Sequence, residues 1–130
     1  MAEPVQRQYV LDAGALIALE RGSLEMAALV KLASRHHIEL ILPSAVLAQV
    51  WRDGSQQDLL AKALRNPAFL EAPLHHGEAK QIGLLLCSSK TADVVDTHVA
   101  LLADRLAAPV ITSDPKDLAR LDPNLTLIEI

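Results

Sequence analysis

Aromatic side chains are scarce in this chain of 130 residues, which contains one tyrosine, one tryptophan and one phenylalanine. Proteins that bind single-stranded nucleic acid by stacking its bases need a platform of such side chains, so this class of binder is excluded. Cysteine is equally scarce, and the lone Cys87 excludes an internal disulfide and a cysteine-based zinc site. Because Cys87 ends an apolar run, we expect it to be a small core residue.

The chain also lacks an excess of positive charge, since its formal net charge is −4 and its sequence pI is about 5.7. Without a basic surface to attract phosphates, a nucleic-acid substrate requires a local basic patch or a bound cation. No apolar run approaches the roughly 18 residues of a membrane span, and the first residues lack the pattern of a signal peptide. We therefore expect a cytoplasmic protein with no membrane partner.

Short apolar segments alternate with helix-forming segments along the whole chain. The predicted strands are residues 9–11, 38–42, 69–73, 109–112 and 125–130. The predicted helices are residues 13–19, 23–35, 44–51, 56–65, 76–86, 93–107 and 115–121. This alternation predicts one α/β domain over residues 1–130, with a mainly parallel sheet covered on both faces. The carboxyl ends of its strands then share one edge, where open α/β sheets bind ligands.

Four aspartates fall at that predicted edge. Asp12 directly follows the first strand, and Asp114 follows the strand 109–112 after a single serine. Asp93 and Asp96 begin a helix and, three residues apart, share one of its faces. Because clustered carboxylates repel one another unless a cation neutralises them, and oxygen ligands suit Mg²⁺ or Mn²⁺, the pattern indicates a metal site.

Helix capping is the alternative explanation for these acids. Aspartate is a favoured capping residue, and both Asp93 and Asp114 are followed by a second acid within the first helical turn. Pro115 occupies the preferred first position of a helix. Asp12 is harder to explain by capping alone, because it ends an apolar strand that leads into the core.

Four segments carry a resemblance to a known family: YVLDAGALIAL at 9–19, PSAVLAQV at 43–50, DVVDTHVA at 93–100 and VITSD at 110–114. In order and spacing they resemble PIN-domain ribonucleases, specifically the small VapC-like toxins of bacterial toxin–antitoxin pairs. The resemblance implies a three-layer α/β/α sandwich with a central, mainly parallel sheet. It also implies Mg²⁺- or Mn²⁺-dependent cleavage of RNA, of the tRNA or rRNA class, by a metal-activated water.

The resemblance assigns roles to the acids. It implies that Asp12, Asp96 and Asp114 are the catalytic residues and the metal ligands. Asp93 lies beside Asp96 and Asp117 lies beside Asp114, so both are expected to be helpers.

The chain departs from the family pattern at two positions. Gln49 stands where members usually carry glutamate, and its amide oxygen is a helper ligand without charge. Asp53, one turn later, is a candidate to replace part of the missing acid's role. Gly14 stands where members usually carry serine or threonine, so a hydroxyl is also missing.

Three further residues carry predictions of their own. Arg52 follows the helix that carries Gln49, and Lys116 flanks the acidic edge. Both are candidates for RNA binding through phosphate, although a solvated surface role competes with this interpretation. His98 is two residues past Asp96, so it points away from the acidic face of the helix and is expected to be non-catalytic.

Hydrophobic residues make up 51% of the chain, more than a domain of this size buries completely. With the resemblance, this implies a homodimer and an antitoxin peptide that lies in an apolar groove near the first helices.

Two other functions compete with that of a toxin nuclease. A catalytically silent PIN-like binding module is suggested by Gln49 and Gly14, and a phosphoacceptor receiver domain shares the acidic edge but needs a paired acid beside Asp12.

Overall fold

The computed structural model describes residues 7–52, 57–89 and 93–130, in which strands and helices alternate as expected. The strands are β1 (Gln8–Leu11), β2 (Glu39–Pro43), β3 (Phe69–Ala72), β4 (Val110–Thr112) and β5 (Leu127–Glu129). The helices are α1 (Ala13–Glu20), α2 (Leu24–Arg35), α3 (Ser44–Val50), α4 (Asp58–Leu64), α5 (His76–Ser89), α6 (Val94–Leu106) and α7 (Pro115–Leu121).

The strands form one sheet in the order β3-β2-β1-β4-β5, and every neighbouring pair is parallel. The central strand β1 is fully buried at Val10, which pairs with Ile41 on one side and with Val110 on the other. The chain moves outward from β1 to β3 on one side and then returns to β4 on the other. The crevice between the carboxyl ends of β1 and β4 is therefore the topological switch point of the sheet, where α/β proteins bind ligands.

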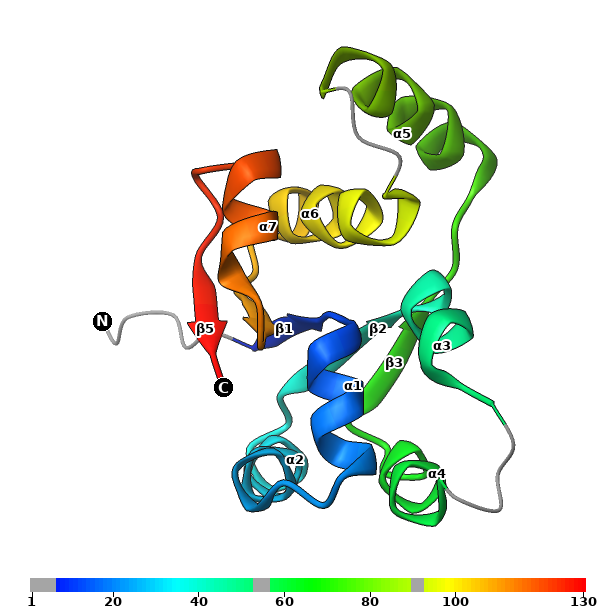
Figure 1. Ribbon diagram of the computed structural model, residues 1–130. Coiled ribbons are helices and arrows are strands. Elements are labelled where there is room, and N and C mark those ends of the chain that lie inside the picture. The colour runs from blue at the N-terminus through cyan, green and yellow to red at the C-terminus, as the bar shows by residue number, and fades with distance from the viewer. Residues whose placement is uncertain (1–6, 53–56, 90–92) are drawn as a thin grey trace.

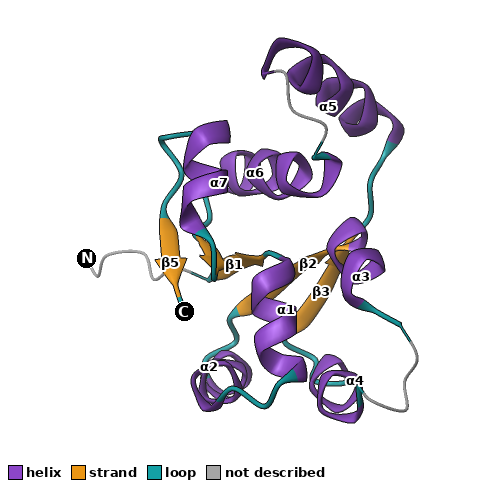
Figure 2. Ribbon diagram, in the orientation of Figure 1, coloured by secondary structure: helices purple, strands orange, loops and turns teal. Residues whose placement is uncertain are grey.

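Helices cover both faces of this sheet. Helices α1, α2 and α4 lie on one face and α6 and α7 on the other, while α5 packs on α6 (Figure 1, Figure 2). Helix α3 follows β2 and contacts both α1 and α6. The predicted three-layer α/β/α sandwich with its mainly parallel sheet is confirmed.

Local signals set most of the element boundaries. Ser23 caps α2, because its hydroxyl accepts a hydrogen bond from the Met26 N–H at 3.2 Å. The strand β2 ends at Pro43, which has no N–H to continue the ladder. The predicted start of α4 at residue 56 lies outside the described residues, and within them the helix begins at Asp58. Helix α5 continues beyond the predicted residue 86 to Ser89.

Cys87 corrects one prediction, because it is exposed rather than part of the core. Helix α5 buries Glu78 and Ile82, which are four residues apart and form a narrow stripe against α6. Cys87 lies off this stripe, and Leu84 is 74% exposed. An uninterrupted apolar run gives no periodicity from which its buried face can be predicted. Among the described residues, the helices are too short or too polar to cross a membrane.

Candidate active site

Asp12 lies at the carboxyl end of β1 and begins α1. Its carboxylate accepts a hydrogen bond from the Ala15 backbone N–H at 3.1 Å, so it does cap the helix. The residue is only 6% exposed, however, and burial raises the pKa of its carboxyl. Hydrogen bonds from Thr112, Ala15 and Gly14 lower this pKa, whereas the charge of Asp114 raises it further. Asp12 is therefore a buried carboxylate close to a second one, and capping alone does not describe it.

Asp114 follows β4 and stands at the start of α7, with Pro115 in the first turn. Its side chain makes no capping hydrogen bond. Its backbone N–H instead donates to the Thr112 hydroxyl at 2.9 Å, which fixes the residue at the end of the strand. Capping of α7 is thus not the role of this exposed carboxylate, which lies near enough to Asp12 to affect its pKa.

Asp93 and Asp96 stand at the start of α6. The capping interpretation holds for Asp93, whose carboxylate accepts a hydrogen bond from the Asp96 N–H at 2.9 Å. Asp96 is half-buried, and burial together with the neighbouring Asp93 raises its pKa to about 7. The charges of Asp12 and Asp117 raise the same pKa, so the start of α6 lies in the electrostatic field of β1 and α7.

The structure therefore brings together acids from the end of β1, the start of α6 and the segment from β4 into α7. Asp12, Asp96 and Asp114 share this edge, with Asp93 and Asp117 beside them. A hard divalent cation fits such a donor set, since it would relieve the repulsion that raises these pKa values. Among the described residues, no three histidine, cysteine, aspartate or glutamate side chains are grouped closely enough to hold a metal ion in the present side-chain positions.

The other predicted site residues that the structure describes stand on α7 and near the end of α3, and of these Asp117 raises the pKa of Asp96. Asp117 is exposed and its carboxylate lies 3.7 Å from the Arg120 guanidinium, while Lys116 is exposed in the same turn of α7. Gln49 is exposed near the end of α3. Asp53, its proposed substitute, lies outside the described residues.

Arg52 is bound locally rather than directed at the acids. Its guanidinium donates to the backbone oxygens of Ala48 at 3.3 Å and of Trp51 at 2.7 Å. These bonds satisfy carbonyls at the end of α3, so the structural interpretation of Arg52 is the better supported one.

A model of the PIN domain family matches residues 9–123, which is most of the chain. The chain belongs to the PIN domain family. Members of this family are nucleases, so the acidic edge has the composition expected of a hydrolytic centre. Curated proteins provide no match to this sequence.

Solved structures agree with this PIN fold. The toxin–antitoxin complex VapBC2 from Rickettsia felis, bound to a DNA fragment from its promoter, contains a chain with a TM-score of 0.74 and 18% identity. That match covers 95% of this PIN domain and 98% of the other chain. The protein PAE2754 from Pyrobaculum aerophilum matches with a TM-score of 0.65 and 16% identity, over 95% of this chain and 92% of its own.

Thr112 is a site residue that the sequence analysis missed. It is fully buried at the end of β4, and its hydroxyl bonds both the Asp12 carboxyl and the Asp114 N–H. The sequence signal for Thr112 is a polar residue at the end of an apolar strand, two residues before a predicted acid. In this PIN domain Thr112 positions two acids from neighbouring strands.

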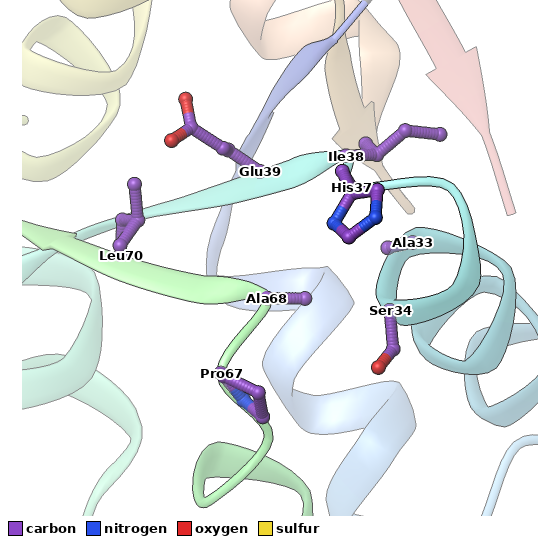
Figure 3. A pocket seen from close by; sticks show the side chains of 8 residues that line it. All are labelled: Ala33, Ser34, His37, Ile38, Glu39, Pro67, Ala68 and Leu70. Atoms are coloured by element: carbon purple, nitrogen blue, oxygen red, sulfur yellow. The ribbon is translucent and has the colours of Figure 1, made fainter.

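A hollow of about 220 Å³ near the amino ends of β2 and β3 does not belong to this site (Figure 3). Its one carboxylate, Glu39, accepts a hydrogen bond from the Gln8 amide at 2.9 Å. The opposite, carboxyl edge therefore remains the candidate active site of the PIN domain.

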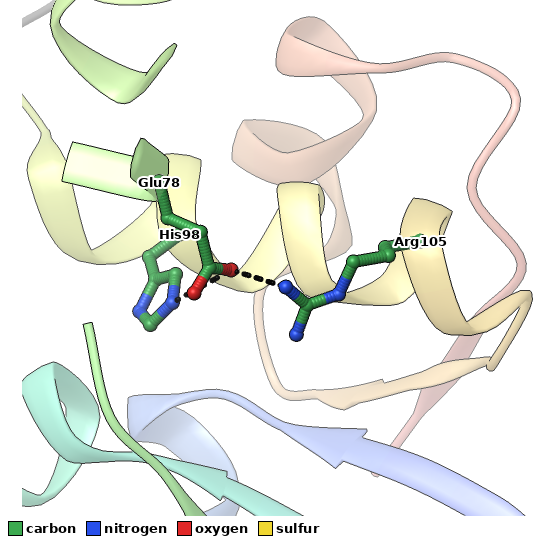
Figure 4. A network of polar contacts seen from close by, with 3 residues as sticks. All are labelled: Glu78, His98 and Arg105. Atoms are coloured by element: carbon green, nitrogen blue, oxygen red, sulfur yellow. Dashed lines mark hydrogen bonds and ion pairs between the residues drawn. The ribbon is translucent and has the colours of Figure 1, made fainter. Parts of the chain in front are cut away.

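His98 is completely buried between α6 and α5, so it does not line the acidic edge (Figure 4). Its Nε2 lies 3.8 Å from the Glu78 carboxylate, which accepts a 2.9 Å hydrogen bond from Arg105. Burial lowers the pKa of His98, although Glu78 acts in the opposite direction. This network joins α5 to α6 and has a structural role.

Proposed function

We propose that this PIN domain is a Mg²⁺- or Mn²⁺-dependent endoribonuclease that acts in the cytoplasm as the toxin of a toxin–antitoxin pair, with tRNA or rRNA as its substrate. The observation that carries the proposal is the proximity of three acids at the carboxyl edge: the charge of Asp114 raises the pKa of Asp12, and the charge of Asp12 raises the pKa of Asp96. Family membership decides against the receiver-domain alternative.

In this proposal Asp12, Asp96 and Asp114 hold the divalent cation. When bound, the cation supplies the positive charge that offsets the acidic edge and the substrate phosphate, and it lowers the pKa of water. Thr112 fixes the Asp12 carboxylate, and Asp93 fixes the first turn of α6 that carries Asp96. Because the pKa of Asp96 is raised to about 7, this carboxyl must lose its proton before it can act as a ligand.

The test is cleavage of a panel of tRNA and rRNA fragments in Mg²⁺ or Mn²⁺. The wild type is expected to cleave at defined sites, and Asp12→Asn or added EDTA is expected to abolish cleavage. Asp104→Asn is the matched control, because Asp104 is exposed on α6 about two turns beyond Asp96. Cleavage that persists in Asp12→Asn, or none over the whole panel, contradicts the proposal.

The antitoxin is proposed to bind in a groove formed by α1, α2 and α4, which lie side by side on one face of the sheet (Figure 1). The groove has a volume of about 480 Å³ and lies beside Leu24 and Leu59, which are 86% and 55% exposed. Lys31 and Lys62 stand on its rim. The partner segment is therefore expected to be apolar with an acidic residue at its edge.

Expression in bacteria tests this partner. The wild type should arrest growth, and co-expression of the small protein encoded beside its gene should restore it and co-purify. Leu59→Glu should abolish co-purification while leaving cleavage intact. Ile128→Glu is the control, since Ile128 is also exposed but lies on β5, outside the groove. If both variants lose co-purification equally, the groove is not the antitoxin-binding site.

A homodimer is also proposed. The exposed Leu84 and Leu85 of α5 add apolar surface outside the groove. Light scattering of the purified wild type should give twice the monomer mass, and a monomer at micromolar concentration contradicts this part of the proposal.

The second candidate is a PIN-like binding module without catalysis. Gln49 favours it, because an amide in place of a carboxylate leaves the cation with less negative charge. Titration with Mn²⁺ separates the two functions: binding below the millimolar range supports the nuclease, whereas its absence supports the silent module.

A further inference from the structure

Gly14 and Ser113 share one position at the acidic edge. A Cβ atom built on Gly14 would overlap the Ser113 hydroxyl oxygen and would come within 3.0 Å of the Ser113 Cβ. It would also lie 3.1 Å from the Ser113 backbone nitrogen. The side chain of Ser113 thus fills the space that any larger residue at position 14 would need.

The backbone does not require glycine at this position. Gly14 is the second residue of α1, in ordinary helical conformation, where glycine is less favourable than alanine. What requires glycine is the approach of Ser113 from the segment after β4. The glycine therefore leaves room for a hydroxyl against the first turn of α1.

Ser113 lies within the acidic site itself. It is the residue between Thr112 and Asp114, and the N–H of the adjoining Gly14 bonds the Asp12 carboxyl. Ser113 is exposed, so its side chain does not fill a core. Among the residues that the structure describes, its hydroxyl makes no hydrogen bond. An accessible, unbonded hydroxyl beside Asp114 is suited to donate to a phosphate oxygen.

We propose that Ser113 is a catalytic residue whose hydroxyl donates a hydrogen bond to the scissile phosphate, and that Gly14 is the residue that allows it to lie there. This inference rests on the proposed nuclease function. In this chain the hydroxyl group comes from Ser113, in the segment after β4, because Gly14 has no side chain to provide one.

A double-mutant cycle over these two positions tests the inference. Ser113→Ala should lower kcat/KM for RNA cleavage by about ten- to a hundredfold, the effect of losing one hydrogen bond to a charged group. Gly14→Ala should cause a similar loss, because the new methyl group displaces the hydroxyl. In the Ser113→Ala background, Gly14→Ala should cost less than it does in the wild type, because the overlap with the hydroxyl oxygen is gone and only the close contacts with the Cβ and backbone nitrogen of residue 113 remain.

A second measurement does not depend on turnover. Fluorescence anisotropy in EDTA should show that Ser113→Ala binds the same RNA several-fold more weakly, because a phosphate contact is lost. Ser34→Ala is the matched control, as an exposed serine on α2. Thermal melting should show all four proteins of the cycle folded.

The outcomes separate this inference from the function on which it rests. If the wild type cleaves and Ser113→Ala cleaves and binds RNA equally well, the role of Ser113 is overturned and the nuclease stands. Losses from Gly14→Ala and Ser113→Ala that simply add also overturn it, because Gly14 would then act independently. If the wild type neither cleaves nor binds RNA, both proposals fall.

Discussion

The backbone N–H of Asp114 donates a 2.9 Å hydrogen bond to the hydroxyl of Thr112, the last residue of β4. The same hydroxyl bonds the carboxyl of Asp12, which directly follows the neighbouring strand β1. One buried side chain thus links two acids that are about a hundred residues apart in the sequence. The relative position of these acids depends on it.

Thr112→Val should therefore weaken both the fold and the metal site. Valine has the same shape but no hydroxyl, so we expect the free energy of unfolding to fall by about 1–2 kcal/mol. Removing the residue that orients a ligand should lower Mn²⁺ affinity about tenfold. Urea unfolding and calorimetric titration measure the two effects. Thr126→Val, at an exposed position, should change neither; unchanged Mn²⁺ affinity in Thr112→Val would refute the role of Thr112.

Asp96 should make the metal-free protein less stable as the pH rises. Its pKa is raised from 3.8 to about 7 in the folded state, so between these values the folded state holds a proton that the unfolded state has lost. This contribution to the free energy of unfolding is present near pH 4 and is lost as the pH rises through about 7.

Asp96→Asn should flatten this pH dependence and stabilise the metal-free protein at pH 7.5. Because Asp96 is half-exposed, solvent screening limits the gain to about 1 kcal/mol, or several degrees in Tm. In Mn²⁺ the order should reverse, since the wild type gains the binding free energy. Melting in EDTA and in Mn²⁺ across pH 5–8 measures both, with Asp104→Asn as the control. If the Asp96→Asn variant melts below the wild type in EDTA, this account is contradicted.

The sequence predicted the fold and the acidic edge because both follow from local signals. Asp12 and Asp114 each stand at the end of an apolar strand, and parallel strands end at one edge. The burial of individual side chains between helices was not predictable from the sequence, because it depends on how the helices pack. The wrong prediction for Cys87 and the missed burial of His98 both depend on how α5 rests on α6, which their own segments do not encode.

His98 should make the protein less stable in acid. Burial lowers its pKa in the folded state, so the unfolded state takes up a proton first as the pH falls below 6.5. Its two ring nitrogens have no hydrogen-bond partner among the described residues. At pH 7.5, His98→Leu should therefore leave the free energy of unfolding unchanged or raise it by about 1 kcal/mol. At pH 5 its advantage in stability over the wild type should be larger.

This test must compare variants at each pH, because Asp96 acts in the opposite direction between pH 4 and 7. Urea unfolding of the wild type, His98→Leu and the exposed control His36→Leu at pH 5.0, 6.0 and 7.5 provides the differences. The pH dependence of His98→Leu relative to the wild type is the informative quantity. A difference that stays constant from pH 5.0 to 7.5 would show that His98 titrates normally.

Substitution of Gln57 should destabilise the fold more than substitution of most other polar residues. It is only 3% exposed, and its amide nitrogen donates to Glu20 Oε1 and to the Val50 carbonyl, each at 3.0 Å. Its oxygen accepts from the Arg52 N–H at 2.9 Å. These bonds tie the end of α1 to the end of α3, so Gln57→Leu should lower the free energy of unfolding by about 3 kcal/mol.

Gln57→Glu tests the direction of these hydrogen bonds. The second oxygen of glutamate would face two acceptors, Glu20 and the Val50 carbonyl, so the variant should be destabilised at pH 7.5. Acidification should rescue it, because a protonated glutamic acid donates one hydrogen bond again. Urea unfolding at pH 7.5 and 5.0 measures the rescue, with the exposed Gln81→Glu as control. Equal losses at both pH values would mean that the hydrogen bonds of Gln57 do not hold these helix ends together.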